Sequence, residues 1–567
     1  MRYPTFEAPA EYRSVVDIFR GYNHNLRIGD GEFFDMKNMT SDLYPVLSPR
    51  PGRRLHMEGN VTGLIAKDSL CYTDGSDFVV NGYHLDLGLS EGPKQLVSMG
   101  AYVIILPDKM WVNTLDTTDF GRIEAKVETA SEVTFELSTV DGEEYSGAVA
   151  SSAEPESPEN MQYWIDTSSE PNVLKQYSSA SAMWVDIPTT YIRISAVGIG
   201  KAFEKFDGVT ISAAAVDSLN TSTVIWGRGD DYIIVPGILA AEVVQSEPLT
   251  VERAMPDMDF VTESGNRLWG CKYGLVNGKF VNEIYASKLG DFKNWNCFMG
   301  ISTDSYAASC GTDGQFTGAI THLGYPLFFK EGCVHKVYGN YPANFQIQTT
   351  ALRGVQKGCD RSLAIVGEVL YYKARHAICA YDGSLPQEVS AAFGEEAYAG
   401  AVAAAHGSKY YVSMLDRENR PHLFVLDTAK GMWHREDDFR VTELCGCKGR
   451  LYGLSGGHIY DMTGGNEQVK WMVTTGTLGT DDPEQKYISR VTVRLSMALG
   501  ARVAFYIQYD SVGPWVSLGT VTGTSLRSVS VPIRPRRCDH FRLRMEGQGD
   551  VRIYSIARTI TEGSEVV

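Results

Sequence analysis

The chain has 567 residues, of which 43% are hydrophobic and 21% are charged, and its net charge is −17. This length and composition are typical of several globular domains with sizeable cores. The acidity argues against tight binding of a phosphate backbone over a broad surface, because such binding relies on clustered Lys and Arg. The sequence has no apolar run of the ~18 residues that a spanning helix needs and no signal-peptide core. We therefore expect a protein that is assembled in the cytoplasm without a membrane anchor.

Residues 1–60 are expected to form an extended leader. Two short extended pieces, 25–28 and 32–36, flank the sequence GDG, and glycine accepts the positive φ that a hairpin turn needs. The leader has few residues for a core of its own, and a basic stretch, 50–54, follows two prolines. Two interpretations are open: the leader packs on its own domain, or it also contacts a neighbouring subunit.

Residues 61–120 and 221–465 repeat one pattern. Apolar and polar residues alternate around a DGS turn in "GLIAKDSLCYTDGSDFVVNG", and similar units such as "GYPLFFKEGCVHKVYG" and "GEVLYYKARHAICAYDGS" follow downstream. This alternation predicts antiparallel strands. Four-strand units that recur every ~40–50 residues are typical of a β-propeller. The sequence therefore predicts an all-β protein with a β-propeller of about six to eight blades, and places Trp295 and Trp433 in blade cores.

Two other regions differ from the repeats. Residues 121–220 predict an inserted β-sandwich-like domain, because alternating strands flank the acidic run "SSAEPESPEN". Residues 466–567 carry long alternating strands that predict a C-terminal β-sandwich. Its outward positions hold several arginines: Arg490, Arg494, Arg542, Arg544 and Arg552. Three interpretations of this basic surface are open, namely that it meets phosphates, meets an acidic partner, or solvates a strand face.

No catalytic motif is recognisable, and we expect neither a cofactor nor a metal ion. The chain lacks a phosphate-binding loop and an HExxH zinc motif, and Cys445 and Cys447 are not spaced as a zinc pair. The one G-x-S-x-G match, around Ser455, precedes a predicted strand, whereas a nucleophile elbow precedes a helix. The sequence therefore predicts a protein that is not an enzyme.

A carboxylate pair drawn from different blades would leave no local motif, as in glycosidase propellers. Asp77 with Asp259 is one such pair. The adjacent carboxylates Glu143 and Glu144, and likewise Glu395 and Glu396, would point to opposite faces of a strand and could not flank one bond. A glycan-binding or glycan-cleaving propeller therefore stays open as an alternative, as does a monomeric interaction module.

Three segments together resemble the structural tail proteins of tailed bacteriophages. They are the leader "GYNHNLRIGDGEFFDMKNMTSDLYPVLSPRPGRR", the blade "NRLWGCKYG" with "NEIYASKLGDFKNW", and the terminal "VTVRLSMALGARVAFYIQYDSVGPWVSLG". The nearest group is the β-propeller tail-hub or nozzle class of short-tailed phages, which includes the packaged-DNA stabilisation proteins. The resemblance covers most of the chain but not the inserted domain.

This resemblance implies a virion protein of the phage tail, assembled in the host bacterial cytoplasm as a homo-oligomeric, hexameric ring around the DNA exit channel. The ring would retain the genome and then conduct it during ejection, with transient DNA contact in an acidic lumen. Its other partners would be the portal or adaptor and other tail proteins. We expect subunit contacts from the leader, through apolar anchors and cations that face acidic surface: Phe33, Phe34, Tyr44, Arg50, Arg53 and Arg54.

Overall fold

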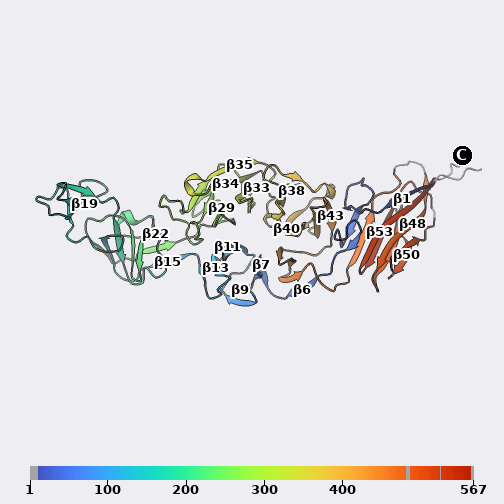
Figure 1. The fold of residues 1–567 in the computed structure, drawn as a ribbon, viewed down its shortest axis with the longest axis horizontal. Helices are drawn as coiled ribbons and strands as arrows, with labels where there is room; N and C mark the ends of the chain where they lie inside the picture. Colours follow the sequence, from blue (N-terminus) through green and yellow to red (C-terminus); the bar gives the residue numbers. More distant parts are fainter. Residues whose placement is uncertain (1–10, 481–484, 524, 535, 563–567) are drawn as a thin grey trace, which may run out of the picture. The chain divides into compact units, whose positions relative to one another are not determined.

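The structure, a computed structural model, describes residues 11–480, 485–523, 525–534 and 536–562. These residues are dominated by strands (Figure 1), and the predicted all-β class is confirmed. Their helices are single 3-10 turns: η1 (Asp217–Leu219), η2 (Pro342–Asn344), η3 (Asp360–Ser362) and η4 (Ala391–Phe393). None of the helices in these ranges has the length and apolarity that a membrane crossing requires.

Seven groups of four strands among the described residues have the arrangement of propeller blades, within the predicted range. In chain order the groups are β7 (Val61–Ala66), β8 (Leu70–Asp74), β9 (Asp77–Val80) and β10 (Tyr83–Asp86); β11 (Gln95–Met99), β12 (Tyr102–Leu106), β13 (Met110–Asn113) and β14 (Phe120–Arg122); β28 (Phe260–Ser264), β29 (Arg267–Val276), β30 (Lys279–Ala286) and β31 (Tyr306–Ser309); β32 (Gly318–His322), β33 (Tyr325–Lys330), β34 (Cys333–Tyr338) and β35 (Gln346–Ala351); β36 (Ala364–Val366), β37 (Val369–Lys373), β38 (Ile378–Tyr381) and β39 (Gln387–Glu388); β40 (Ala399–His406), β41 (Lys409–Leu415), β42 (Pro421–Asp427) and β43 (Met432–Arg435); and β44 (Glu443–Cys447), β45 (Arg450–Ser455) and β46 (His458–Asp461) with the leader strand β6 (Arg54–Met57).

An Asn-Gly turn shows how the local sequence builds a blade. It joins β29 to β30, where Val276 pairs with Lys279, and φ is 49° at Asn277 and 80° at Gly278. Two successive positive φ values match the twist of the flanking strands, and Asn-Gly favours them. Trp295, which follows this hairpin, is 3% exposed. Its predicted place in a blade core is confirmed, as is that of Trp433.

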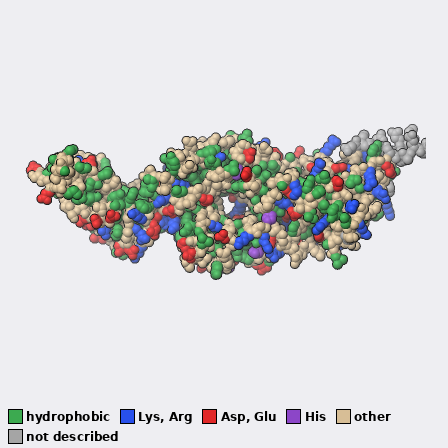
Figure 2. All heavy atoms as spheres, viewed as in Figure 1, with side chains coloured by type: hydrophobic (Ala, Val, Ile, Leu, Met, Phe, Trp, Pro, Cys, Tyr) green, Lys and Arg blue, Asp and Glu red, His purple; other side chains and the backbone are tan. Residues whose placement is uncertain are grey.

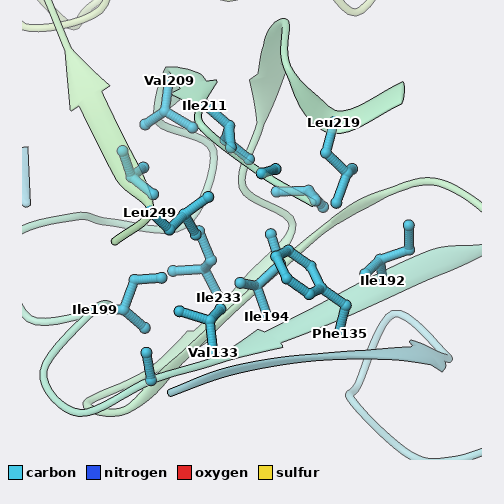
Figure 3. Packing of buried hydrophobic residues seen from close by; sticks show 14 of the residues in the cluster. Val133, Phe135, Ile192, Ile194, Ile199, Val209, Ile211, Leu219, Ile233 and Leu249 are labelled. Carbon is cyan, nitrogen blue, oxygen red and sulfur yellow. The ribbon is translucent and has the colours of Figure 1, made fainter. Parts of the chain in front are cut away.

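The inserted domain contains two sheets that share one core. The sheets are, in spatial order, β15 (Ala125–Glu128), β27 (Thr250–Arg253), β22 (Gly208–Ser212) and β23 (Ser222–Val224); and β24 (Gly227–Gly229), β25 (Tyr232–Pro236), β21 (Tyr191–Ser195), β16 (Val133–Ser138) and β26 (Val243–Gln245). Phe135 and Ile194 from the second sheet and Val209 from the first point into this core (Figure 3). A smaller third sheet holds β17 (Val149–Ser151), β18 (Tyr163–Asp166), β19 (Val173–Ser178) and β20 (Met183–Asp186).

The insertion extends beyond the predicted boundary at residue 220. Strands β23 to β27, within residues 222–253, pair with one another and with earlier strands of the insertion, and the blade pattern resumes only at β28. Ala125 pairs with Arg253, for example. Short alternating strands look alike in a blade and in a sandwich, so only this long-range pairing distinguishes the two.

The predicted C-terminal sandwich is present, and the leader contributes strands to it. One sheet has the order β1 (Glu11–Val16), β53 (Val551–Glu562), β48 (Lys486–Met497) and β51 (Arg527–Val531), whose long strands lie together in Figure 1. The other continues from β40–β43 through β2 (Gly21–Tyr22), β3 (Glu32–Lys37), β47 (Lys470–Thr475), β52 (Phe541–Gln548), β49 (Arg502–Tyr509) and β50 (Val516–Thr522). A separate pair is formed by β4 (Met39–Thr40) and β5 (Ser48–Pro49).

The leader therefore packs on its own domain, as both interpretations require. Strand β2 joins the blade strand β43 to β3, so that a blade and the sandwich share one continuous sheet. Gly21 in β2 has φ of 84°, and a Cβ there would collide with the carbonyl oxygen of Trp433. Glycine alone permits this close passage. Contact of the leader with a neighbouring subunit stays a prediction.

Internal contacts divide the chain into two compact units. One comprises Met1–Pro93, Phe329–Val334 and Ala351–Val567, and the other comprises Lys94–Phe328 and His335–Thr350. Within the first unit, β44 contacts β7 and β40, as neighbouring blades do; within the second, β28 contacts β11 and β32. The candidate sites described below lie in the first unit.

Candidate functional site

Two arginines of the leader are buried in a network of carboxylates. The Arg50 side chain is 1% exposed and donates from Nε to Asn38 Oδ1 at 2.8 Å and from Nη2 to Asp437 Oδ2 at 3.1 Å. Arg53 lies 2.6 Å from Glu436 Oε2 and 2.8 Å from Asp437 Oδ2. Hydrogen bonds between such charged groups are strong, and removal of one partner leaves a costly buried charge. The acidic surface predicted for these two cations is thus supplied by their own chain.

The other predicted contact residues differ in exposure. Arg54 has a side chain 52% exposed and lies 3.2 Å from Asp461. Phe33 is 1% exposed, which corrects its role as a subunit anchor, because its ring lies inside its own domain. Phe34 is half-buried, and Tyr44 is 42% exposed. Of the three predicted aromatic anchors, Tyr44 presents the most surface to a partner.

Strand β1 is a sheet edge that carries apolar side chains. Among the described residues it pairs with β53 alone. Tyr12 and Val15 on this strand are 60% and 54% exposed, and Ile18 just after it is 45% exposed. An edge strand offers N–H and C=O groups to which a further strand can add. The leader therefore presents an apolar edge that the sequence analysis had not singled out.

A second candidate site is a charged group where η3 meets strand β44. Asp360 and Arg361 lie in η3, and Glu443 opens β44. Arg361 donates from Nη1 to Glu443 Oε2 at 3.1 Å and to the Thr442 carbonyl at 3.3 Å. The Glu443 side chain is 17% exposed. The sequence analysis missed this group, because its members are 82 residues apart and belong to no motif.

Both carboxyl groups of this cluster have perturbed acidities. Burial raises the pKa of Glu443 to about 7 against the opposing charge of Arg361, and the nearby Asp360 adds to the rise. Burial also raises the pKa of Asp360. A carboxyl group that is half protonated near neutral pH can act as a general acid, and a second carboxylate nearby can act as a base. The two pKa shifts make this cluster a candidate for acid–base chemistry.

The turn that carries Asp360 and Arg361 is held in place by buried hydrogen bonds. The Tyr410 hydroxyl donates to the Ser362 carbonyl at 2.8 Å, and the Ser362 hydroxyl donates to the Cys359 carbonyl at 2.5 Å and accepts from the Lys373 amide at 2.9 Å. Ser362 and Tyr410 are fully buried. Asp360 and Arg361 therefore lie on a rigid turn, as a preorganised site requires.

The carboxylates singled out from the sequence have local partners. Asp77 lies 3.4 Å from His84 Nδ1, and Asp259 lies 2.9 Å from Lys272 Nζ and accepts from the Tyr273 amide. The adjacent pairs Glu143 and Glu144, and Glu395 and Glu396, are exposed. Ser455 ends strand β45 and pairs with His458 across a hairpin turn. A strand therefore follows Ser455, as predicted, and not the helix of a nucleophile elbow.

The cysteines in the described ranges are free thiols, most of them buried. Burial raises the pKa of the Cys445 thiol to about 12, and the neighbouring Glu443 adds to this rise. Within those ranges no group of three His, Cys, Asp or Glu side chains is placed to hold a metal ion.

No family model matches this chain, and no curated protein matches it. Similar solved structures include an exo-β-1,3-galactanase from Phanerochaete chrysosporium, 9% identical over 52% of this chain and 95% of that chain, with a TM-score of 0.22. A glycoside hydrolase family 43 arabinoxylan arabinofuranohydrolase from Bacillus subtilis is 8% identical over 52% and 94%, with a TM-score of 0.20. PorZ, a surface component of the type-IX secretion system of Porphyromonas gingivalis, is 10% identical over 88% and 77%, with a TM-score of 0.26. Likenesses with such low TM-scores carry no functional argument.

The prediction that the chain is not an enzyme is withdrawn beside these structures, several of which are glycoside hydrolases. That prediction relied on the absence of a motif from the sequence. Carboxylates contributed by distant segments form no such motif, and Asp360 and Glu443 are an example of two that lie far apart in the sequence.

Proposed function

We propose that the chain is a structural subunit of a phage tail, forming a ring that retains the genome and then conducts it during ejection. The observation that supports this proposal is the leader, the segment that carries much of the resemblance to tail proteins. Its buried arginines anchor it within one unit, while its strand β1 leaves apolar side chains exposed along a sheet edge.

An anchored leader whose strand β1 is an edge strand among the described residues suits ring assembly. A closed ring is built from heterologous contacts, in which one surface of a subunit meets a different surface of the next. A strand edge can provide backbone hydrogen bonds to the next subunit, and Tyr12 and Val15 can provide apolar contact. Tyr44, the exposed member of the predicted anchors, offers a second apolar contact.

Charge at β1 should therefore impair assembly. We expect Val15→Asp to lower incorporation of the chain into virions about tenfold, because an ionised carboxylate in an apolar interface is costly. The measurement is the copy number per particle, from electron microscopy of virions made in a host that expresses the variant. Val185→Asp is the matched control, since Val185 is also 54% exposed but lies in β20 of the inserted domain. A single copy on the tail axis, a position on the capsid surface, or equal incorporation of both variants would contradict the proposal.

A second candidate function, hydrolysis of a glycan, is favoured by the Asp360–Glu443 pair. Glu443 in its protonated form would give a proton to the leaving oxygen of the glycosidic bond. Asp360 in its ionised form would take a proton from the attacking water. This candidate rests on the raised pKa values of the two groups and on the hydrogen bond that holds Arg361 against Glu443.

The acidity of Glu443 gives this second candidate a specific pH dependence. Hydrolysis should fall as pH rises through about 7, because the protonated acid is lost. Glu443→Gln should lower turnover by about 10²–10⁴-fold, whereas Glu395→Gln, at an exposed carboxylate, should not. Arg361→Met should move the alkaline limb to higher pH, because the Arg361 charge favours the ionised form of Glu443. Reducing-sugar release from a panel of β-linked glycans is the measurement; no release, or release that survives Glu443→Gln, would refute this candidate.

A further inference from the structure

The outer face of the ten-stranded sheet carries a polar groove over β47, β52 and β49. Along these strands buried residues alternate with more exposed ones, so Val473, Met545 and Phe505 lie on the core face. The cross-strand register aligns the residues opposite to the core face in three rows: Lys470, Gln548 and Arg502; Met472, Glu546 and Ala504; and Thr474, Arg544 and Tyr506. Thr474 is itself buried. Lys37 of β3 extends the second row. Figure 2 shows Lys and Arg side chains over this end of the first unit.

The groove has the size of a ligand site. Its volume is about 680 Å³, and the residues that line it include Lys37, Lys470, Arg502, Tyr506, Glu546 and Gln548. Specific small-molecule sites span about 300–1,000 Å³. Ala504 stands between Arg502 and Tyr506 on the same face, and its small side chain leaves the space that the longer neighbours enclose.

The third row continues the groove into a strip of arginines and aromatic rings. The Arg544 guanidinium lies 4.2 Å above the Trp515 ring, and that of Arg542 lies 4.4 Å above the Phe34 ring. Burial and the neighbouring charge of Arg544 lower the pKa of Arg542. Among the described residues the buried Nε of Arg542 has no hydrogen-bond partner. Arg544 also lies 3.7 Å from Glu546 Oε1 and donates from Nε to Thr474 Oγ1 at 3.1 Å. A bound anion would add a second partner for Arg544 and would relieve its repulsion of Arg542.

The mixture of groups identifies the kind of ligand. Carboxylate, amide and ammonium groups together can both accept from and donate to sugar hydroxyls, and Tyr506 offers a flat apolar surface for a sugar ring. Glu467 and Glu546 also line the groove, and two carboxylates would repel the closely spaced phosphates of a nucleic acid. Arginine pairs bidentately with a carboxylate. A sugar chain with occasional carboxylates matches the hydrogen-bonding groups, the flat apolar surface and the arginines.

We propose that this groove and the adjoining Arg542–Arg544 strip bind an acidic polysaccharide. Sugar rings occupy the groove beside Tyr506, and a uronate carboxylate pairs with Arg544. This site lies on the sandwich and involves neither Glu443 nor strand β1, so it is independent of both proposed functions. Of the three interpretations of the basic C-terminal surface, the proposal corresponds to contact with an acidic partner, and that partner is a glycan.

Calorimetric titration of the full chain with a hyaluronan oligosaccharide, in which each uronate alternates with a neutral sugar, tests the proposal. We expect saturable binding that a neutral maltooligosaccharide of equal length does not reproduce. Arg544→Gln and the groove-filling Ala504→Trp should each weaken binding about tenfold or more. Arg494→Gln is the matched control, because Arg494 is an exposed arginine on the other sheet of the sandwich, and it should change the affinity less than about twofold.

A second readout distinguishes a loss of binding from a loss of folding in the variants. Trp515→Phe keeps the stacked ring but should remove most of any fluorescence change that the hyaluronan oligosaccharide causes in the wild-type chain. Absence of hyaluronan binding at millimolar concentration, or binding unchanged by Ala504→Trp, would overturn the proposal. Equal binding of poly-aspartate or of duplex DNA would also overturn it, because the site would then select charge rather than an acidic sugar.

Discussion

Arg50→Ala should lower the free energy of unfolding of the first unit by about 3–5 kcal/mol. The Arg50 side chain is 1% exposed and lies 3.1 Å from Asp437 and 3.6 Å from Glu436. Its removal leaves the Asn38 side-chain oxygen without its donor from Arg50. It also leaves Arg53 to balance both Glu436 and Asp437 within the buried network. The measurement is denaturant-induced unfolding. A chain with several domains need not unfold in one step, so the free energy is taken from the transition whose midpoint differs between variant and wild type.

Arg54→Ala provides the control for Arg50. Arg54 also pairs with a buried carboxylate, that of Asp461, but its side chain is 52% exposed and Arg450 remains 2.9 Å from the same carboxylate. An exposed ion pair contributes about 0–1 kcal/mol, so this change should have little effect. Equal losses for the two variants would show that the buried network does not anchor the leader.

Acid should destabilise the first unit through His434. This side chain is 3% exposed, and burial, reinforced by the charge of Lys409, lowers its pKa from 6.5 to about 3. Between these values the unfolded chain binds a proton that the folded chain does not. The stabilising contribution is therefore complete above pH 6.5 and is lost as pH falls towards about 3. The maximal slope for one proton is about 1.4 kcal/mol per pH unit.

His434→Leu should remove this part of the pH dependence. We expect the free energy of unfolding of the variant to change less than that of the wild type between pH 6 and pH 4, by about 2–3 kcal/mol. The same experiment on His376→Gln, at an exposed histidine, should retain the wild-type slope. Lysine partners lower the pKa values of Asp42 and Asp427 despite burial, and both groups still titrate in His434→Leu. The stability that is lost when these carboxylates are protonated below pH 4 is therefore lost in all variants. If His434→Leu keeps the full slope, His434 is not the group that acid titrates.

The features that the sequence determined by itself are local ones. Alternation of apolar and polar residues is imposed by the two-residue period of a strand, so the all-β class, the recurring blades and the C-terminal sandwich followed from it. The Asn277–Gly278 turn depends on backbone preferences of two adjacent residues. Trp295 and Trp433 are large apolar side chains within such strand patterns, and their burial was predicted for that reason.

The features that only the tertiary structure decided depend on pairing between distant segments. Residues 222–253 carry the same alternation as a blade, yet they pair with strands of the insertion. The leader has too few apolar residues for its own core and is placed by sheet edges and carboxylates contributed by later segments. Arg361 and Glu443 become a charged pair only when η3 and β44 meet. In each case the stabilising contact joins residues far apart in the chain, and a local sequence pattern contains no information about which distant partner will be chosen.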